Sequence, residues 1–233
     1  MAVSHRGNCH GLCHLPAGPG RTRCRITIKA FVQIAAEAGL KHIVLLSGRG
    51  EKGAERAEEI LKASGLAWNI VRASWFCQNF SESFMLEGIL AGELVLPAGD
   101  TVEPFIDADD IADVAVAALT EPRHRNKLFE VTGPCAMTFA QCTQEMSDAL
   151  GQPLKFTTVP IDAYIEALQE QGVPEDLQWL LRELFTVVFD GRNSNVMPGV
   201  EEALGRPATD FKTWVQKTLE SGVWDTVMWK ESA

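Results

Sequence analysis

The sequence predicts an α/β protein with a parallel sheet, because one pattern of helix, glycine and apolar strand occurs twice in succession. In the first copy, apolar residues recur at helical spacing up to Gly39, and the run His42–Leu46 has the composition of a buried strand. In the second copy, a charged helix over residues 51–62 is followed by Gly65 and by the extended run Trp68–Arg72. Such a succession is typical of parallel strands joined by right-handed crossovers.

Downstream of these repeats the pattern becomes mainly helical. The segment Asp107–Asp110 precedes an apolar helix, and we interpret it as a helix cap and not as a calcium loop, whose sixth position must be glycine and is Ala112 here. The sequence therefore predicts an α/β half followed by a mostly helical region. Further helices are expected over residues 79–90, 138–150, 162–171, 174–189 and 210–220, and short strands over 94–96, 104–107, 127–131 and 156–159.

Composition and charge exclude several classes of protein. The chain has 233 residues, with 21 basic and 31 acidic side chains and a formal net charge of −10. Because nucleic-acid binding depends on Lys and Arg that neutralise phosphates, this balance argues against a nucleic-acid partner. The longest apolar runs are far shorter than the ~20 residues needed to span a bilayer. We therefore expect no membrane partner. Six cysteines are too sparse for a secreted disulfide framework, so we also expect a cytoplasmic protein.

Residues 1–25 differ in character from the rest of the chain. Zinc binding is one interpretation of their cysteines and histidines, but Cys9 and Cys13 are four residues apart instead of three, and no returning Cys/His pair follows. The segment is also rich in glycine and proline and has no hydrophobic period. We therefore favour a disordered or aberrant leader and expect no metal. The residues concerned are Cys9, His10, Cys13, His14 and Cys24.

The usual catalytic motifs do not occur in this sequence. Tyr164 is the single tyrosine, and the fourth residue after it is Leu168, so no Tyr-x-x-x-Lys pair for proton transfer exists. There is no G-x-S-x-G elbow, no phosphate-binding P-loop and no G-x-G-x-x-G fingerprint. The glycines of the leader neither follow a predicted strand nor open a predicted helix. No catalytic residue can be assigned from the sequence.

Candidate binding residues follow two successive predicted strands. Ser47 and Gly48 follow the first strand, and the turn from Ser74 through Trp75 and Phe76 follows the second. The carboxyl ends of parallel strands form the edge at which open α/β sheets bind ligands. Small residues let a ligand approach the backbone, and aromatic rings offer a stacking wall. The alternative is that the two aromatic residues belong to the hydrophobic core.

Residues 26 to about 224 resemble the carboxy-terminal two thirds of the NmrA-like family of atypical short-chain dehydrogenase/reductases. The resemblance is closest to the bacterial members and to the ergot-alkaloid-type reductases of that family. The stretches that carry it, in this order, are Lys41-His42-Ile43-Val44-Leu45-Leu46-Ser47, Ala63-Ser64-Gly65-Leu66, Val71-Arg72-Ala73-Ser74-Trp75-Phe76-Cys77-Gln78-Asn79-Phe80, Pro104-Phe105-Ile106-Asp107-Ala108-Asp109-Asp110-Ile111-Ala112, Thr132-Gly133-Pro134 and Leu204-Gly205-Arg206-Pro207.

The resemblance implies a truncated Rossmann-like parallel sheet that binds NADP or NAD, with a smaller, mostly helical substrate domain. We expect residues 1–25 to be a leader, 26–135 to be the remaining part of the NAD(P)-binding domain and 136–233 to form the substrate-binding region. Family members begin with a glycine-rich loop and several βα units, about 90 residues at roughly 30 per unit, that have no counterpart here. A truncated gene, a misplaced start or an out-of-frame leader would account for this. Many relatives have Lys or His where this chain has Ala54, and most have proline where it has Ala73.

The resemblance also implies which residues contact ligands. The cofactor-binding residues would be Ser47, Gly48, Arg72, Ser74, Trp75, Phe76 and Asn79, and the substrate-binding residues Phe84, Met85, Tyr164, Trp179 and Phe185. The implied activity is hydride transfer from NAD(P)H to a small apolar or quinone-like molecule, impaired by the missing loop. The alternative is a non-catalytic NAD(P)-sensing regulatory protein. Without the missing units, one edge of the strand His42–Leu46 would be unpaired, so we also expect self-association through that edge.

Overall fold

The computed structural model describes residues 10–14 and 21–225 and divides the chain into two compact units. Unit 1 comprises Met1–Ser74, Asp109–Thr132 and Met197–Pro207, and unit 2 comprises Trp75–Ala108, Gly133–Val196 and Ala208–Ala233. The two units therefore alternate along the sequence instead of meeting at the one boundary, near residue 135, that the sequence predicts. The difference arises because the chain leaves unit 1 after Ser74 and returns to it twice.

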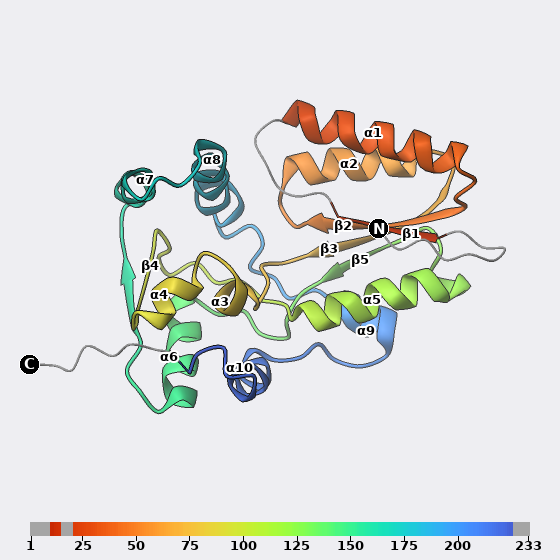
Figure 1. The fold of residues 1–233 in the computed structure, drawn as a ribbon. Coiled ribbons are helices and arrows are strands. Elements are labelled where there is room, and N and C mark those ends of the chain that lie inside the picture. Colours follow the sequence, from red (N-terminus) through yellow and green to blue (C-terminus); the bar gives the residue numbers. More distant parts are fainter. Residues whose placement is uncertain (1–9, 15–20, 226–233) are drawn as a thin grey trace, which may run out of the picture. The chain divides into compact units, whose positions relative to one another are not determined.

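Unit 1 contains a four-stranded parallel sheet with the strand order β1-β2-β3-β5 (Figure 1). The register pairs His42 of β2 with Ala67 of β3, and Asn69 of β3 with Lys127 of β5. The α/β fold with parallel strands that the sequence predicts is confirmed. The strands are β1 (His10–His14), β2 (His42–Gly48), β3 (Ala67–Ala73) and β5 (Lys127–Val131).

The first strand corrects two expectations about the start of the chain. β1 lies within the range for which the sequence predicts no regular structure, and helix α1 (Arg21–Glu37) also begins inside that range. β1 pairs with β2 from His10–His42 to His14–Leu46, so the edge of β2 that we expected to be open is hydrogen-bonded. The proposed cause of self-association along β2 is therefore absent.

Other predictions about the leader fall outside the described part of the chain. Residues 15–20, which include Gly18 and Gly20, connect β1 with α1, contrary to the expectation that the leader glycines neither follow a strand nor precede a helix. Their structure and that of Cys9 lie outside the described residues. The side chains of His10, Cys13, His14 and Cys24 also lie outside it, so the predicted absence of a metal there stays a prediction.

Four helices cover the two faces of the sheet in unit 1. Helices α1 and α2 (Lys52–Lys62) lie on one face, and α5 (Ala108–Thr120) and α9 (Gly199–Leu204) lie on the other (Figure 1). Apolar residues of α1 and α2, such as Ile28 and Leu61, pack against Ile43, Leu45 and Ile70 of the sheet. A short 3₁₀ helix, η1 (Pro122–His124), precedes β5. Burial of apolar groups on both faces explains why these strands are almost continuously apolar.

Unit 2 is mostly helical, as the sequence predicts for the substrate region. Its one described sheet is the parallel pair β4 (Glu93–Leu96) and β6 (Lys155–Thr158). Of the expected second strand over residues 104–107, only Ile106 forms an isolated bridge, to Phe76. The helices are α3 (Asn79–Glu82), α4 (Leu86–Leu90), α6 (Phe139–Leu150), α7 (Ile161–Glu170), α8 (Glu175–Glu183), the π-helical turn η2 (Leu184–Val188) and α10 (Phe211–Glu220).

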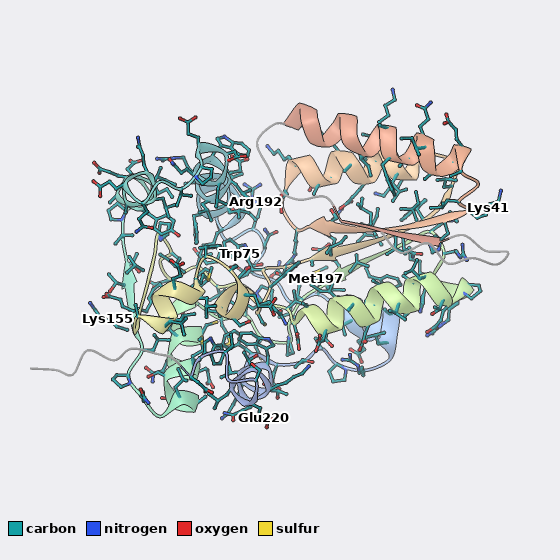
Figure 2. The ribbon with its side chains drawn as sticks, in the orientation of Figure 1. Lys41, Trp75, Lys155, Arg192, Met197 and Glu220 are labelled. Atoms are coloured by element: carbon teal, nitrogen blue, oxygen red, sulfur yellow. The ribbon has the colours of Figure 1, made fainter. Side chains whose placement is uncertain are left out.

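The core of unit 2 is rich in aromatic rings. Trp75 lies 5.2 Å from Phe185 and 5.6 Å from Phe139 between ring centroids, and Phe80 lies 5.4 Å from Phe105. The side chains around Trp75 are drawn in Figure 2. The pairs Trp75–Phe139 and Phe80–Phe105 are edge-to-face, an arrangement that adds to the stabilisation that burial provides. None of the helices in the described ranges is long and apolar enough to cross a membrane.

Candidate functional site

The carboxyl ends of three strands of unit 1 lie side by side in register. Ser47 of β2 pairs with Arg72 of β3, which in turn pairs with Glu130 of β5. Beyond the strands the ladder continues, because the Arg49 N–H donates to the carbonyl of Ala73 (2.9 Å). The candidate binding residues that follow separate strands in the sequence are thereby brought to one edge of the sheet.

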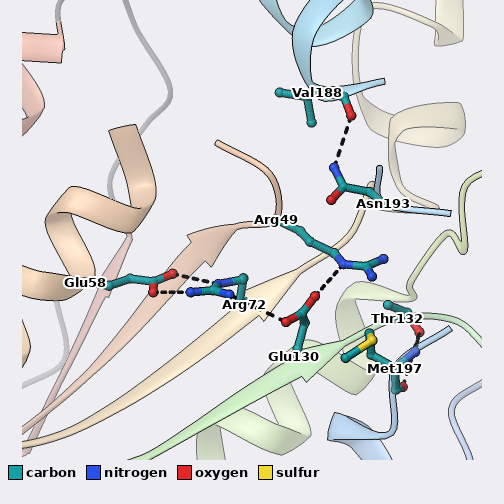
Figure 3. A network of polar contacts seen from close by, with 8 residues as sticks. All are labelled: Arg49, Glu58, Arg72, Glu130, Thr132, Val188, Asn193 and Met197. Atoms are coloured by element: carbon teal, nitrogen blue, oxygen red, sulfur yellow. Dashed lines mark hydrogen bonds and ion pairs between the residues drawn. The ribbon is translucent and has the colours of Figure 1, made fainter. Parts of the chain in front are cut away.

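A chain of polar contacts joins these strand ends (Figure 3). The Ser47 hydroxyl donates to Glu58 Oε1 (2.6 Å), and Arg72 binds the same carboxylate through Nε (3.0 Å) and Nη2 (2.5 Å). Arg72 Nη1 lies 3.5 Å from Glu130 Oε2, and Arg49 Nε donates to Glu130 Oε1 (2.6 Å). We call Ser47, Arg49, Glu58, Arg72 and Glu130 the strand-end network.

Glu58 is the most deeply buried member of the strand-end network. It lies on α2, its side chain is 1% exposed, and three hydrogen bonds reach its two carboxylate oxygens. Burial of an unpaired carboxylate is costly, and these three donors offset the cost of burying the Glu58 side chain. The hydrogen bonds that Arg72 donates to Glu58, opposed by burial, raise the pKa of the Arg72 guanidinium, which therefore stays charged.

The Glu51 side chain lies against Gly48 at the end of β2. A Cβ atom added at Gly48 would lie 1.9 Å from Glu51 Oε1, so a larger residue there would require the flexible end of the Glu51 side chain to move. The backbone hydrogen bond from Arg49 to Ala73 connects the turn to β3.

The structure shows where each predicted cofactor residue of unit 1 lies. Ser47 and Ser74 are 6% and 4% exposed, and Gly48 is half-buried beside them. The guanidinium of Arg72 contacts two carboxylates of the strand-end network. Ser47, Gly48, Arg72 and Ser74 are therefore together at the strand ends, with the Ser47 proton directed to Glu58.

The other predicted cofactor residues lie in unit 2. Trp75 is 9% exposed and packs among phenylalanine rings, as the alternative interpretation of this residue as core expects. Phe76 is half-buried and forms a backbone bridge with Ile106, and the half-buried Asn79 begins α3.

The predicted substrate residues also lie in unit 2 but differ in exposure. Met85 and Phe185 are buried, Tyr164 is half-buried, and Phe84 and Trp179 are 36% and 41% exposed. The rings of Tyr164 and Phe185 are 5.9 Å apart in an edge-to-face arrangement. The structure thus brings this pair together.

Three members of the strand-end network, Arg49, Glu58 and Glu130, are not among the binding residues predicted from the sequence. Arg49 and Glu130 are 81 positions apart, and only the pairing of three strands brings them into contact. The sequence signal is only local: Arg49 follows the apolar run Ile43–Leu46 by three positions, and Glu130 lies between Phe129 and Val131. That signal does not reveal the partner.

The chain has clear relatives, although no protein-family model matches it. It is 33% identical over 198 residues to the (4-alkanoyl-5-oxo-2,5-dihydrofuran-3-yl)methyl phosphate reductase of Streptomyces griseus, a match that covers 80% of this chain and 69% of that enzyme. It is 31% identical over 194 residues to the NAD(P)H azoreductase of Xenophilus azovorans, with 78% and 66% covered. The chain belongs to the NmrA-like family of atypical short-chain dehydrogenase/reductases. The resemblance identified from the sequence is confirmed.

The fold of this NmrA-like chain also matches solved structures. The NADPH-dependent quinone oxidoreductase of Escherichia coli, solved in complex with NADPH, superposes with a TM-score of 0.76 at 20% identity and covers 90% of this chain and 76% of that one. This likeness shows the Rossmann-like fold. The matches to the curated reductases span about two thirds of the length of those proteins.

The family implies NAD(P) as cofactor, and the residues at the strand ends suit its flat nicotinamide ring better than its pyrophosphate. Small residues at the carboxyl edge, Gly48 and Ser74 among them, suit the approach of a flat ring to the backbone. A pyrophosphate needs a helix N-terminus without negative charge. However, α2 begins beside Glu51 and carries Glu55 in its first turn, and α5 carries two aspartates in its own. Helices α2 and α5 are therefore poorly suited to a pyrophosphate, whereas α1, which follows β1 in the chain, carries no acidic residue in its first turn.

Proposed function

We propose that this chain is an oxidoreductase that transfers hydride from a nicotinamide cofactor to a small apolar or quinone-like acceptor. The observation that carries the proposal is the aligned carboxyl edge of β2, β3 and β5, which ends in small residues within a family of NAD(P)-binding oxidoreductases. Its relatives include an azoreductase and its structural neighbours a quinone oxidoreductase, both of which act with NADPH or NAD(P)H.

The residues divide into those that contact the nicotinamide and those that support them. Ser47, Gly48 and Ser74 of unit 1 would border it, and Trp75, Phe76 and Asn79, which follow Ser74 in the sequence, are the other proposed cofactor residues. Bound NADPH or NADH supplies the hydride. Arg72 would act indirectly, because its guanidinium is engaged with Glu58 and Glu130.

Solvent supplies the proton in this proposal. Ala54 stands one helical turn before Glu58, where many relatives have Lys or His, so α2 offers no acid at that position. Burial raises the pKa of Tyr164 to about 12, which makes its phenol a poor proton donor near neutral pH. Reduction of a quinone or a similar conjugated acceptor can take its proton from water after hydride transfer.

The acceptor would be bound by apolar residues of unit 2. Phe84 and Trp179 offer exposed aromatic surface, and Tyr164 is half-buried against Phe185. Met85 packs in the core beneath. Such a lining suits a flat, weakly polar molecule.

We also propose that the 233-residue chain binds the cofactor weakly. No glycine-rich dinucleotide fingerprint occurs in its sequence, and α2 and α5 begin with carboxylates. The absence of a Tyr-x-x-x-Lys pair favours the second candidate function, a regulatory protein that senses NAD(P) without turnover. The two functions differ in whether an acceptor is reduced.

The test is NADPH oxidation at 340 nm with anthraquinone-2-sulfonate as acceptor, at millimolar NADPH to compensate for weak binding. We expect the purified chain to accelerate the reaction over buffer and Ser74→Val to slow it by at least about five-fold. Thr120→Ala, at an exposed end of α5, is the control and should keep the wild-type rate. A wild-type rate equal to that of buffer would exclude the oxidoreductase, and saturable NADPH binding without turnover would support the regulatory protein.

A further inference from the structure

Helix α7 presents an apolar stripe that the rest of unit 2 covers only in part. Ile161, Tyr164, Ile165 and Leu168 recur at the spacing of one helix face, and each of them is half-buried. No residue of α7 is fully buried. Tyr164 is the one member of this stripe with a polar group.

Aromatic contacts connect Tyr164 with the turn that follows β3. Its ring is 5.9 Å from Phe185, and Phe185 is 5.2 Å from Trp75. Trp75 is the residue directly after Ser74, whose N–H donates to Val131 at the end of β5 (3.1 Å). The series of rings runs from Trp75 through Phe185 to Tyr164, and its polar groups are the indole N–H of Trp75 and the hydroxyl of Tyr164.

The hydroxyl of Tyr164 makes no hydrogen bond with any described residue. Trp224, another aromatic residue of unit 2 with a polar group, shows the contrast: it is 1% exposed, and its indole N–H donates to the carbonyl of Phe80 (3.1 Å). Aromatic residues that are purely structural usually satisfy their polar group in this way. Tyr164 keeps a donor available on a partly apolar surface.

The protonation state of Tyr164 makes that donor constant. Burial raises its pKa to about 12, so the phenol keeps its proton throughout the neutral range. The group can thus donate a hydrogen bond without titrating. A phenol in these surroundings matches a ligand atom that has a lone pair and no proton, such as a carbonyl oxygen or an azo nitrogen.

We propose that Tyr164 determines acceptor specificity by donating a hydrogen bond to the lone pair of a flat, conjugated carbonyl or azo compound that packs against Phe185. This inference rests on the proposed oxidoreductase function and names the chemical class of its acceptor. The apolar stripe of α7 would bind the ring system, and the hydroxyl would discriminate between rings with and without an acceptor atom. One neutral hydrogen bond of this kind changes affinity by about three- to ten-fold.

The test compares two ligands with the same ring skeleton by isothermal titration calorimetry without cofactor. Anthraquinone-2-sulfonate carries two carbonyl oxygens, and anthracene-2-sulfonate has none. We expect Tyr164→Phe to weaken binding of the quinone by about three- to ten-fold and to leave binding of anthracene-2-sulfonate within about two-fold. Quinone affinity for the wild-type chain should be constant from pH 6 to pH 9.

Phe185→Leu is the matched control, because it removes a ring contact without touching the hydroxyl. It should weaken both ligands by a similar factor. Thermal unfolding of both variants verifies that they fold. Three results would each overturn the proposal. Tyr164→Phe could weaken binding of the two ligands equally, it could weaken binding of neither, or the wild-type chain could fail to bind the quinone.

The same experiment separates this inference from the proposed function. Because no cofactor is present, the contrast between the two ligands does not depend on hydride transfer. A chain that reduces the quinone but shows no contrast would retain its function and lose this specificity residue. A chain that shows the contrast but no turnover would retain the binding role of Tyr164 and lose the oxidoreductase function.

Discussion

Glu58 shows how one buried carboxylate organises the end of a sheet. It accepts hydrogen bonds from β2 through Ser47 and from β3 through Arg72, and Arg72 extends the contacts to Glu130 of β5. The neighbouring Glu59 has the same side chain but points to solvent: it is 71% exposed and pairs with Lys62. Since a buried pair leaves an uncompensated charge when one partner is removed, the two residues should respond very differently to substitution.

Glu58→Gln should lower the free energy of unfolding by about 3 kcal/mol, because Arg72 loses its ionic partner in a partly buried place. Urea denaturation monitored by circular dichroism measures the change. Glu59→Gln is the matched control and should stay within about 0.5 kcal/mol of wild type. Equal effects of the two substitutions would show that the strand-end network contributes no more than a surface pair.

His124 is a second residue whose surroundings predict a measurable effect. Its ring is 1% exposed and stacks edge-to-face on Phe129 at 5.2 Å, and neither ring nitrogen has a well-formed hydrogen bond among the described residues. Burial lowers its pKa below the ordinary value of 6.5, and the nearby charges of Arg123 and Lys127 act in the same direction. Glu121, 3.5 Å away, and a backbone contact at Ala203 oppose them. The ring is therefore neutral in the folded protein.

Stability should fall as the pH drops below about 6.5, because the pKa of His124 is lower in the folded chain than in the unfolded chain. The unfolded chain therefore takes up a proton at His124 first. Above that pH the histidine is neutral in both states and the contribution is fully present. His124→Phe preserves an apolar ring and removes the titration. We expect the difference in Tm between pH 7.5 and pH 5.5 to be smaller in His124→Phe than in wild type. An unchanged difference would mean that other groups account for the acid sensitivity.

At the scale of elements, a close backbone contact connects α9 to the sheet. The Cα of Gly199, the first residue of α9, approaches β5 so closely that an added Cβ would lie 2.3 Å from the carbonyl oxygen of Glu130. Arg206, after α9, binds Asp110 (2.6 Å) and Asp113 (2.7 Å) of α5. These contacts explain why residues 197–207 belong to unit 1.

Gly199→Ala should destabilise the protein by about 2 kcal/mol, because its methyl group meets backbone that cannot move aside as a side chain can. Gly99→Ala provides the comparison. Gly99 is exposed, and an added Cβ meets nothing within 4 Å, so we expect a change within about 0.5 kcal/mol. Chemical denaturation of both variants gives the two values. A Gly199→Ala variant as stable as Gly99→Ala would contradict the assigned packing of α9.

The elements also show how far local sequence patterns predict structure. Helix α6 was predictable, because Thr138 and Gln141 form a capping box at its start and Gly151 adopts φ 66° at its end. The expected helix over residues 79–90 is instead broken into α3 and α4, where Ser83 is extended and its hydroxyl donates to the carbonyl of Asn79. The expected helix over 174–189 changes to π-helical turns at Leu184. Local periodicity does not encode such competition from side chains and tertiary packing.

At the scale of the whole molecule, the sequence predicts the fold class but not the division of the chain. Period and glycine stops identify β2 and β3, and the motifs from Val71 to Asn79 identify the family. The pairing of β1 with β2 was missed, because the leader shows no hydrophobic pattern and strand pairing depends on the partner. Arg49 and Glu130 were missed for the same reason.

We propose that this chain holds a nicotinamide at the carboxyl edge of β2, β3 and β5 while hydride is transferred. A bound nicotinamide exposes one face to the acceptor, whereas a free one reacts from both faces. The most direct measurement uses NADPH carrying deuterium at either the pro-R or the pro-S position of nicotinamide C4, with anthraquinone-2-sulfonate as acceptor. The deuterium content of the NADP formed is read by mass spectrometry. If the chain holds the nicotinamide in this way, one labelled form will lose all of its deuterium and the other will keep all of it. Partial loss from both forms, as in the reaction without protein, would contradict it.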